Sequence, residues 1–274
     1  MHYTRYTPSH PLCDFVEYFW CLTDGPTHSA ERILPGGTTE LVINLHDNEI
    51  RVCDPLNGAS IQRLSGTVVS GPYGRAFDID ASRHAAMLGV HFKPGGARAL
   101  LGVPLHELHD THVDLEQLWN AQACALRARI CEARSDAERF AVVETALRSK
   151  LRADLAPQAN LATALAALVP GTSQPPIGTL AEHAGLSHRE FIKRFTVGVG
   201  MAPKLFARVR RFHLAANRIR AGGTPRWSEF AVETGYADQA HMIRDFHVFG
   251  GMTPVQYHES TRTPAKDDHV ALMA

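Results

Sequence analysis

The sequence has few of the features that mark secreted, membrane-spanning or metal-stapled proteins. Its 274 residues include five cysteines, and no two of them form a C-x-x-C pair: Cys13, Cys21, Cys53, Cys124 and Cys131. An odd number without zinc spacing argues against a disulfide framework and a structural metal site. No stretch approaches the ~18 uninterrupted apolar residues of a membrane span, and the first residues lead into no apolar run of signal length. We therefore expect a protein of the reducing cytoplasm.

Signatures of catalysis are also missing. The sequence has no Gly-x-Ser-x-Gly elbow, no phosphate-cradling Gly-Lys-Ser/Thr loop and no His-Glu-x-x-His helix. Among its 16 histidines, His106, His109 and His112 are spaced by three, but His112 falls in an expected turn, which disfavours a shared ligand face. His84 and His91 flank an expected strand and are interpreted as partly buried imidazoles. We predict no catalytic residue, no metal ion and no cofactor.

Net charge is zero, but the charges are unevenly distributed. Residues 177–257 hold 11 Lys and Arg against 6 Asp and Glu, whereas residues 1–176 hold 15 against 19. The remaining tail from His258 holds 2 against 3. A basic block behind a mildly acidic one is typical of a phosphate-facing module joined to a module with another task.

The first third of the chain is expected to form strands, and the rest helices. Short apolar runs at 33–34, 41–45, 66–70 and 86–92 end at Gly and Pro clusters, which favours a small barrel or sandwich. From Ala97 onward apolar residues recur at helical spacing, until a Pro- and Gly-rich run forms the clearest linker. We predict an α+β chain: a regulatory domain at 1–168 that is β-rich to about 96 and helical after it, a linker at 169–176, an all-α domain at 177–258 and a flexible tail at 259–274.

The region after the linker contains the same pattern twice. One copy runs over 180–195 and the other over 230–246, with Ala181/Ala231 and Gly185/Gly235 identical at an offset of 50. Just after the copies, Gly200/Gly251 and Pro203/Pro254 recur at an offset of 51. In each copy the Ala allows close helix packing, and the Gly at 185 or 235 can adopt the positive φ that ends the first helix. Leu186 or Tyr236 would fill the corner. Ser187 and Asp238 are expected to cap the second helices.

Each second helix has one apolar face and one polar face. Phe191 and Phe195 in the first copy, and Met242 and Phe246 in the second, are four residues apart and therefore share the buried side. This is the architecture of a helix-turn-helix, which offers its second helix to the major groove. Arg and Lys suit guanine edges, Gln suits adenine and Ile suits a thymine methyl. The predicted base-contacting residues are His188, Arg189, Ile192, Lys193, Gln239, Ala240, Ile243 and Arg244.

A long helix is predicted between the two units, from Pro203 to Arg220. Pro203 suits a first helical turn, and an apolar stripe with Arg on the other surfaces follows it. Arginine and lysine beside a reading helix favour phosphate contacts. The predicted phosphate-contacting residues are Ser187, Lys204, Arg208, Arg211 and His241.

With these motifs, the segment from about Ile177 to Tyr257 resembles the C-terminal DNA-binding domain of the AraC/XylS family of bacterial transcription regulators. It shares the Gly-x-x-Pro motif that follows each unit and the Arg-rich connecting helix. It also shares a Gly-Tyr-x-Asp-Gln motif at 235–239, which leads into the second helix of the second unit. The resemblance implies two recognition helices that enter successive major grooves on one face of the DNA. Trp227 stands where the family often has Ile, and Ile192 replaces a usually polar residue, which weakens the case for a base contact there.

Residues from about 8 to 120 resemble a sensor-like domain found ahead of such DNA-binding units. The matching stretches are 10–12 with 18–20, 33–37 with 41–43, 89–97 and 115–119. The resemblance implies a regulatory domain built as a barrel followed by helices. The expected partners are double-stranded DNA, an unknown small-molecule effector and RNA polymerase, with a second copy of the chain as a candidate for a homodimer.

Two functions of other classes fit parts of this sequence. A DNA-repair or nucleotide-modifying enzyme can carry the same kind of DNA-binding domain, but it needs an activated cysteine or a zinc tetrad, which the scattered cysteines do not supply. A protein-interaction module could keep the helical fold without binding DNA, against which the Arg, Lys and Gln of both polar faces argue. The leading hypothesis is a ligand-responsive, sequence-specific transcription regulator that is not an enzyme.

Overall fold

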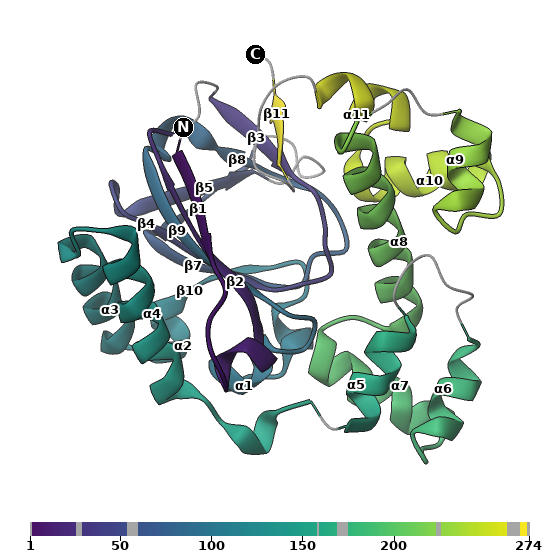
Figure 1. The fold of residues 1–274 in the computed structure, drawn as a ribbon, viewed down its shortest axis with the longest axis horizontal. Coiled ribbons are helices and arrows are strands. Elements are labelled where there is room, and N and C mark those ends of the chain that lie inside the picture. Colours follow the sequence, from purple (N-terminus) through teal and green to yellow (C-terminus); the bar gives the residue numbers. More distant parts are fainter. Residues whose placement is uncertain are drawn as a thin grey trace.

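The computed structural model describes residues 2–25, 29–53, 60–157, 159–168, 175–222, 226–261 and 269–272. Two antiparallel sheets fill the N-terminal half, and helices make up most of the remainder (Figure 1). Most of the predicted linker, residues 169–174, lies outside the described residues. Within the described part, no helix has both the length and the apolar character needed to cross a membrane.

The two sheets form an open sandwich. The six-stranded sheet has the order β1-β2-β9-β4-β7-β10, and the five-stranded sheet has the order β11-β3-β8-β5-β6. The strands are β1 (His2–Tyr6), β2 (Val16–Thr23), β3 (Ala30–Ile33), β4 (Glu40–Asn44), β5 (Glu49–Cys53), β6 (Ile61–Ser65), β7 (Thr67–Ser70), β8 (Phe77–Asp80), β9 (Ala86–Phe92), β10 (His112–Asp114) and β11 (His269–Leu272). The expected β-rich region up to about residue 96 is confirmed, as a sandwich rather than a closed barrel.

Strand β2 shows how the six-stranded sheet serves two cores. Its successive side chains point to opposite faces, so Phe19 and Cys21 pack in one core and Trp20 and Leu22 in the other. The indole of Trp20 crosses the neighbouring strand directly over Gly89, where a Cβ would lie 2.1 Å from the ring. Glycine at position 89 is therefore what allows the tryptophan to lie flat between the two sheets.

Helices cover the outer face of the six-stranded sheet (Figure 1). They are α1 (Ala97–Leu101), α2 (Leu115–Trp119), α3 (Ala121–Glu132) and α4 (Asp136–Lys150), with short 3-10 turns η1 (Leu12–Asp14), η2 (Ala81–Arg83), η3 (Leu105–Leu108) and η4 (Ala153–Leu155). Their apolar stripes, such as Phe140, Val143 and Leu147 on α4, share one buried cluster with Phe19 and Val90 of the sheet. The stripe on α4 is thus core of this domain.

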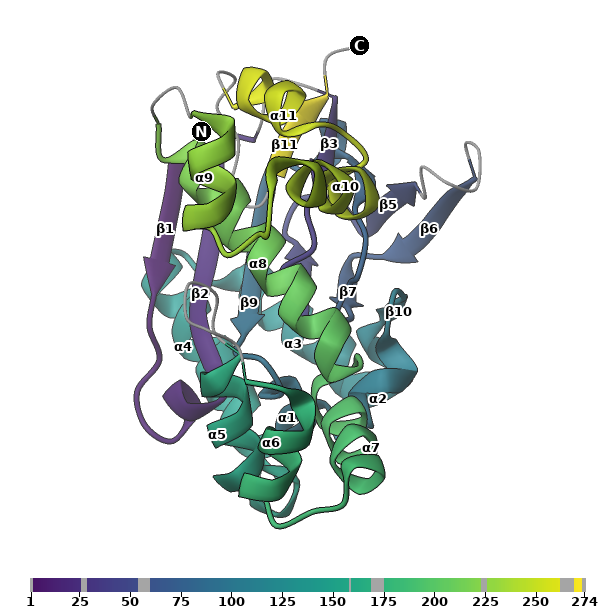
Figure 2. The same cartoon turned by 90° about the vertical axis from the view of Figure 1, so that its right-hand side faces the viewer.

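The C-terminal half is all helical up to Ser260. It contains α5 (Ala159–Ala167), α6 (Ile177–His183), α7 (His188–Val199), α8 (Pro203–Arg220), α9 (Trp227–Glu233), α10 (Gln239–Gly250) and α11 (Pro254–Ser260). Helix α8 has the predicted bounds, with Pro203 in its first turn, and it links the two smaller helical groups (Figure 2). The buried residues of this half form one cluster around Phe195, Phe206, Phe212 and Phe246.

Two boundary expectations need correction. Helix α5, which the sequence placed with the regulatory domain, contributes Ala164 and packs Leu161 and Leu165 in the cluster of the helical half. The tail was expected to be frayed, but its residues 269–272 form β11, which pairs with β3 in an antiparallel register. The apolar Val270 and Ala271 of this short strand are buried, which gives it a reason to remain on the sheet.

The two halves are docked along much of their length. The backbone N–H of Ala76 donates to the carbonyl of Phe249 at 2.7 Å, and Arg210 donates to the carbonyl of Gly36 at 3.2 Å. Leu34, which follows β3, is buried in the cluster of the helical half. The helical half and the sandwich therefore share both polar and apolar contacts.

Candidate nucleic-acid interface and a cavity between the sheets

Both helix-turn-helix units form as the sequence predicted. Gly185 and Gly235 adopt φ values of +65° and +84°, which end α6 and α9 and turn the chain into the next helix. Ser187 caps α7 by accepting from the backbone N–H of Glu190 at 3.3 Å. Asp238 caps α10 by accepting from the backbone N–H of His241 at 2.7 Å. A short polar side chain thus satisfies one unpaired backbone N–H at the start of each of these two helices.

The second helices bury their apolar faces and expose the faces predicted to contact bases. Phe191, Phe195, Met242 and Phe246 are all buried. The exposed members of the reading faces are His188, Arg189, Lys193, Gln239, Ala240 and Arg244, while Ile192 and Ile243 are half-buried. The structure therefore presents both candidate reading faces to solvent, with the two isoleucines at their borders.

The arginines of α8 are used mostly inside the protein. Arg208 donates to Asp245 on α10 at 2.7 Å, and Arg211 lies 3.5 Å from the same carboxylate. Asp245 is only 1% exposed, and Arg211 also stacks over the ring of Tyr236. Burial and the Asp245 charge raise the pKa of Tyr236, so its hydroxyl stays neutral. This group fixes α10 against α8, and sequence reasoning missed Asp245 as its centre.

The predicted phosphate contacts therefore fall into two classes. Ser187 and Lys204 are exposed, whereas Arg208, Arg211 and His241 are half-buried. Lys204, Arg208, Arg211, His241 and Arg244 line one surface groove between α8 and α10, with Asp245 at its base. Two further arginines of α8 face elsewhere: Arg218 donates to the carbonyl of Glu233, and Arg220 donates to the carbonyl of His269.

A second feature lies in the other half, between the two sheets. A cavity of about 60 Å³ is lined mainly by apolar side chains from both inner faces, among them Trp20, Val42, Val52 and Met87. Its polar wall consists of Glu31, Glu40, Ser70, His84 and His269. A mostly apolar hollow with a few convergent polar groups is the usual form of a small-molecule site.

Two of the polar groups on this wall are tightly held. The indole N–H of Trp20 donates to Glu40 at 2.6 Å, and His269 makes a short hydrogen bond to Glu31. His84 is 6% exposed, and burial lowers its pKa to about 4, so its ring is neutral near pH 7. Within the described residues its Nε2 atom has no hydrogen-bond partner. The interpretation of His84 as an ordinary partly buried imidazole is thus too weak, because it is a buried ring on a cavity wall.

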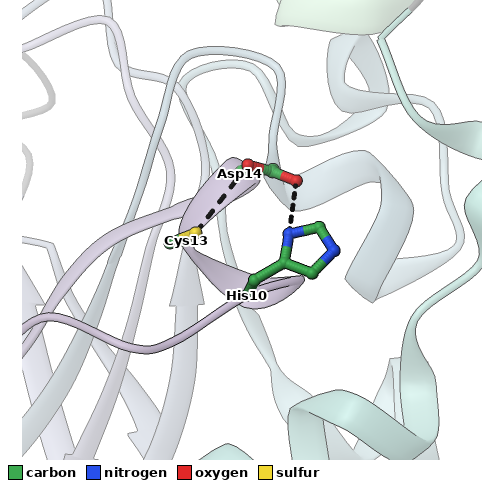
Figure 3. A group of neighbouring side chains, drawn as sticks. All are labelled: His10, Cys13 and Asp14. Carbon is green, nitrogen blue, oxygen red and sulfur yellow. Dashed lines mark hydrogen bonds and ion pairs between the residues drawn. The ribbon is translucent and has the colours of Figure 1, made fainter.

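The three histidines spaced by three do not share a site. His106 is exposed, His109 bonds the Pro72 carbonyl through Nδ1 at 2.8 Å, and His112 is buried beside Ser70. Among the described residues, the one group whose ligand atoms lie within 4.8 Å of one another is His10, Cys13 and Asp14 (Figure 3). Two members of this group are exposed, and they already bond one another across one short turn.

The cysteine environments do not resemble those of nucleophiles. Burial raises the pKa of Cys21 to about 12, and it also raises the pKa of Cys53. The pKa of Cys124 is raised by its hydrogen bond to Glu116. A reactive thiol needs a lowered pKa, so these three sites favour structural roles.

Comparisons with known families divide the chain in a similar way. Residues 4–114 match a family described as a domain of unknown function. Residues 180–260 match a family described as a helix-turn-helix domain. No curated protein sequence matches the chain.

Solved structures similar to this chain include those of ToxT from Vibrio cholerae. An apo lysine-to-alanine variant from strain SCE256 is 10% identical, with 88% of this chain and 97% of that chain covered and a TM-score of 0.48. A 1.65 Å structure is 9% identical, with 94% and 98% covered and a TM-score of 0.47. The unsaturated fatty acid-bound wild type from strain SCE256 is 10% identical, with 86% and 97% covered and a TM-score of 0.45.

At these identities and scores, the likeness to ToxT transfers no ligand or partner to this chain. The family match and the geometry of both units carry the assignment instead. Residues 180–260 thus match a helix-turn-helix domain and contain two capped helix-turn-helix units, and they follow a segment that matches a domain family of unknown function.

Proposed function

We propose that the chain recognises a two-part operator through α7 and α10 and that a small molecule in the sandwich cavity controls this binding. The observation that carries the first half is that both reading helices are capped, buried on one side and exposed on the other. Arg189 and Lys193 on α7, and Gln239 and Arg244 on α10, are the proposed principal base contacts. His188, Ile192, Ala240 and Ile243 complete the two faces.

Phosphate contacts are proposed for the residues that border these faces. Ser187, Lys204 and His241 stand at the helix starts or in the groove between α8 and α10. Arg208 and Arg211 lie in the same groove, where Asp245 already holds them. Their phosphate contacts would use the N–H donors that the shared carboxylate leaves available, since each guanidinium has five.

Effector control is proposed because the cavity wall is adjacent to the docking contacts. Ile33 lines the cavity, and the next residue, Leu34, is buried in the core of the helical half. Phe77 lines the cavity, and the preceding Ala76 donates to the carbonyl of Phe249 at the end of α10. A ligand that spreads the two sheets would thus move residues that directly hold the DNA-binding half.

The first test is selection of genomic fragments bound by the purified full-length protein at two salt concentrations. A motif with two half-sites about one helical turn apart supports two reading helices in successive grooves. Binding that is steeply salt-dependent but lacks any motif contradicts sequence-specific reading. No binding at either salt concentration would favour the interaction-module alternative.

Paired variants then test the reading faces. Arg189→Ala is expected to cost about 1–3 kcal/mol and to relax preference at one base position only. Arg194→Ala is the matched control, because Arg194 lies on the same helix but bonds Glu190 at 2.7 Å away from the proposed face. Arg244→Ala should relax the other half-site. Equal specificity profiles for Arg189→Ala and Arg194→Ala would contradict the assignment.

Partners beyond DNA follow from the same arrangement. Because both units belong to one chain, a single copy can occupy both half-sites. We propose RNA polymerase as the partner through which the bound regulator acts, and a homodimer where operators contain two such sites. Sedimentation of the protein on one selected operator would give one copy per DNA for the monomeric mode and two for the dimeric mode.

A further inference from the structure

Glu31 is an unusual residue for the inside of a sandwich. It lies on β3, and its side chain is 8% exposed among the apolar residues that line the cavity. A carboxylate loses strong hydration when it is buried, so such a group is normally paired or functional. Its partner is His269, which comes from the opposite end of the chain.

The rest of the polar wall has no basic side chain of the lysine or arginine type among its described lining residues. It holds a second carboxylate, Glu40, and the neutral ring of His84. The Nε2 of His84 is a buried polar atom on this wall, and no described residue is its hydrogen-bond partner. A wall of two carboxylates and a neutral imidazole attracts a cation or a strong hydrogen-bond donor, and it repels a carboxylate.

His269 belongs to β11, which is also tied to the DNA-binding half. The strand pairs with β3 from Ala30 to Ile33, and Arg220 at the end of α8 donates to the carbonyl of His269. Arg220 also lies over Tyr257 of α11. One short strand thus bridges the cavity wall and the C-terminal end of the helix that carries both units (Figure 1).

We propose that the cavity binds a small amphiphilic cation, an ammonium or amidinium group on a short apolar body, which takes the place of His269 at Glu31 and releases β11 from β3. This inference rests on the proposed effector control of DNA binding. His269 of β11 occupies the Glu31 side of this cavity, so a cation that pairs with Glu31 requires the strand to move. The ligand and the strand therefore compete for one carboxylate, and that competition couples the cavity to α8.

Ligand class is tested with three probes that share one alkyl chain: n-butylammonium, 1-butanol and butyrate. Titration calorimetry of the full chain should show n-butylammonium binding at least tenfold more tightly than butyrate. Glu31→Gln should remove this preference, whereas Glu17→Gln, at a half-exposed position outside the cavity, should keep it. Tighter binding of butyrate, or equal binding of all three probes, would overturn the cationic class.

Competition with the strand is tested in His269→Ala and in a chain that ends at residue 268. Both variants should bind n-butylammonium at least threefold more tightly than the wild type, because His269 no longer competes with the ligand for Glu31. Hydrogen exchange over residues 30–33 should rise in the wild type with ligand, and it should be high in the shortened chain without ligand. Unchanged affinity in both variants would overturn the competition.

Coupling to DNA is measured on the operator recovered by fragment selection. Saturating n-butylammonium should change the wild-type operator affinity at least threefold relative to sodium chloride at equal ionic strength, and it should change that of the shortened chain less than 1.5-fold. An equal response in both chains would refute β11 as the coupling element. Failure to recover any operator would count against the proposed function, while the calorimetry would still decide the ligand class.

Discussion

Asp245 offers the sharpest test of how the second unit is held in its reading position. Replacing it with Asn keeps the shape and removes the charge that two arginines share. Arg208 and Arg211, both on α8, would then lie against α10 without the buried carboxylate that they share. Because Arg244 on the reading face is the neighbouring residue of α10, any shift of this helix changes a proposed base contact.

The size of the effect follows from burial. Breaking a buried ion pair by removing one partner typically costs 3–5 kcal/mol, because the remaining charge loses its compensation. The side chain of Asp245 is 1% exposed and that of Arg211 is 15% exposed, but that of Arg208 is 38% exposed and is partly screened by water. Allowing for that screening, we expect Asp245→Asn to lower the free energy of unfolding by roughly 2–3 kcal/mol.

Urea unfolding and DNA titrations at several salt concentrations check this expectation. The freed arginines should add about one phosphate contact, so the salt dependence should steepen while the ratio of specific to scrambled DNA binding falls. Glu229→Gln is the control, because it removes the same charge from an exposed pair with Arg226. If both variants unfold and bind alike, Asp245 does not organise the reading helix and the reasoning fails.

Three further predictions concern packing, titration and capping. Gly89→Ala should lower the free energy of unfolding, measured in urea, by at least ~2 kcal/mol, because the new Cβ would lie 2.1 Å from the Trp20 ring. Gly178→Ala is the control: its Cβ would have nothing within 4 Å, so alanine should stabilise α6 by about 0.5–1 kcal/mol. Burial lowers the pKa of His84 to about 4 and that of His112 to about 3 in the folded chain. The free energy of unfolding should therefore be highest above the ordinary histidine pKa of about 6.5 and should fall as the pH drops toward 4. Urea unfolding at pH 7, 5.5 and 4.5 should show this pH dependence, which His84→Gln should reduce and the exposed His106→Gln should leave unchanged. Ser187→Ala should cost about 1 kcal/mol and speed hydrogen exchange in the first turn of α7, whereas Ser187→Thr should retain the cap; equal exchange in both would contradict the capping role.

The parts of the fold that were predicted correctly depend on local signals. Helix α8 has the predicted bounds because Pro203 suits a first turn and its apolar spacing is regular. The caps at Ser187 and Asp238 formed because a short polar side chain can satisfy the next turn without help from elsewhere. Strands β4, β7 and β9 followed from apolar runs that end at Gly and Pro.

The parts that were missed depend on distant contacts. Strand β11 has four residues, and it forms because it pairs with the edge strand β3, which lies more than 230 residues earlier in the chain. The polar Glu31 fits the alternating pattern of a strand with one exposed face. Its side chain is buried because the second sheet covers that face of β3, which the local sequence does not show. Asp245 did leave a readable signal, since Met242, Asp245, Phe246 and Phe249 share the buried stripe of α10 at helical spacing.

The positions of these missed residues explain how the cavity of the sandwich could be coupled to the helix-turn-helix units. A reading helix needs only a rigid shape, and local signals supply that shape in α7, α8 and α10. Control requires a group whose state depends on a different part of the chain, and a local pattern does not show which distant residue such a group contacts. Glu31 and Asp245 are both buried carboxylates held by cations or imidazoles from other elements, one in the cavity wall and one behind the reading face. Arg211 of α8 bonds Asp245, and Arg220 of the same helix bonds β11, whose His269 is hydrogen-bonded to Glu31. Loss of the ion pairs of either Glu31 or Asp245 would therefore change the position of α8, the helix that links the two candidate reading helices.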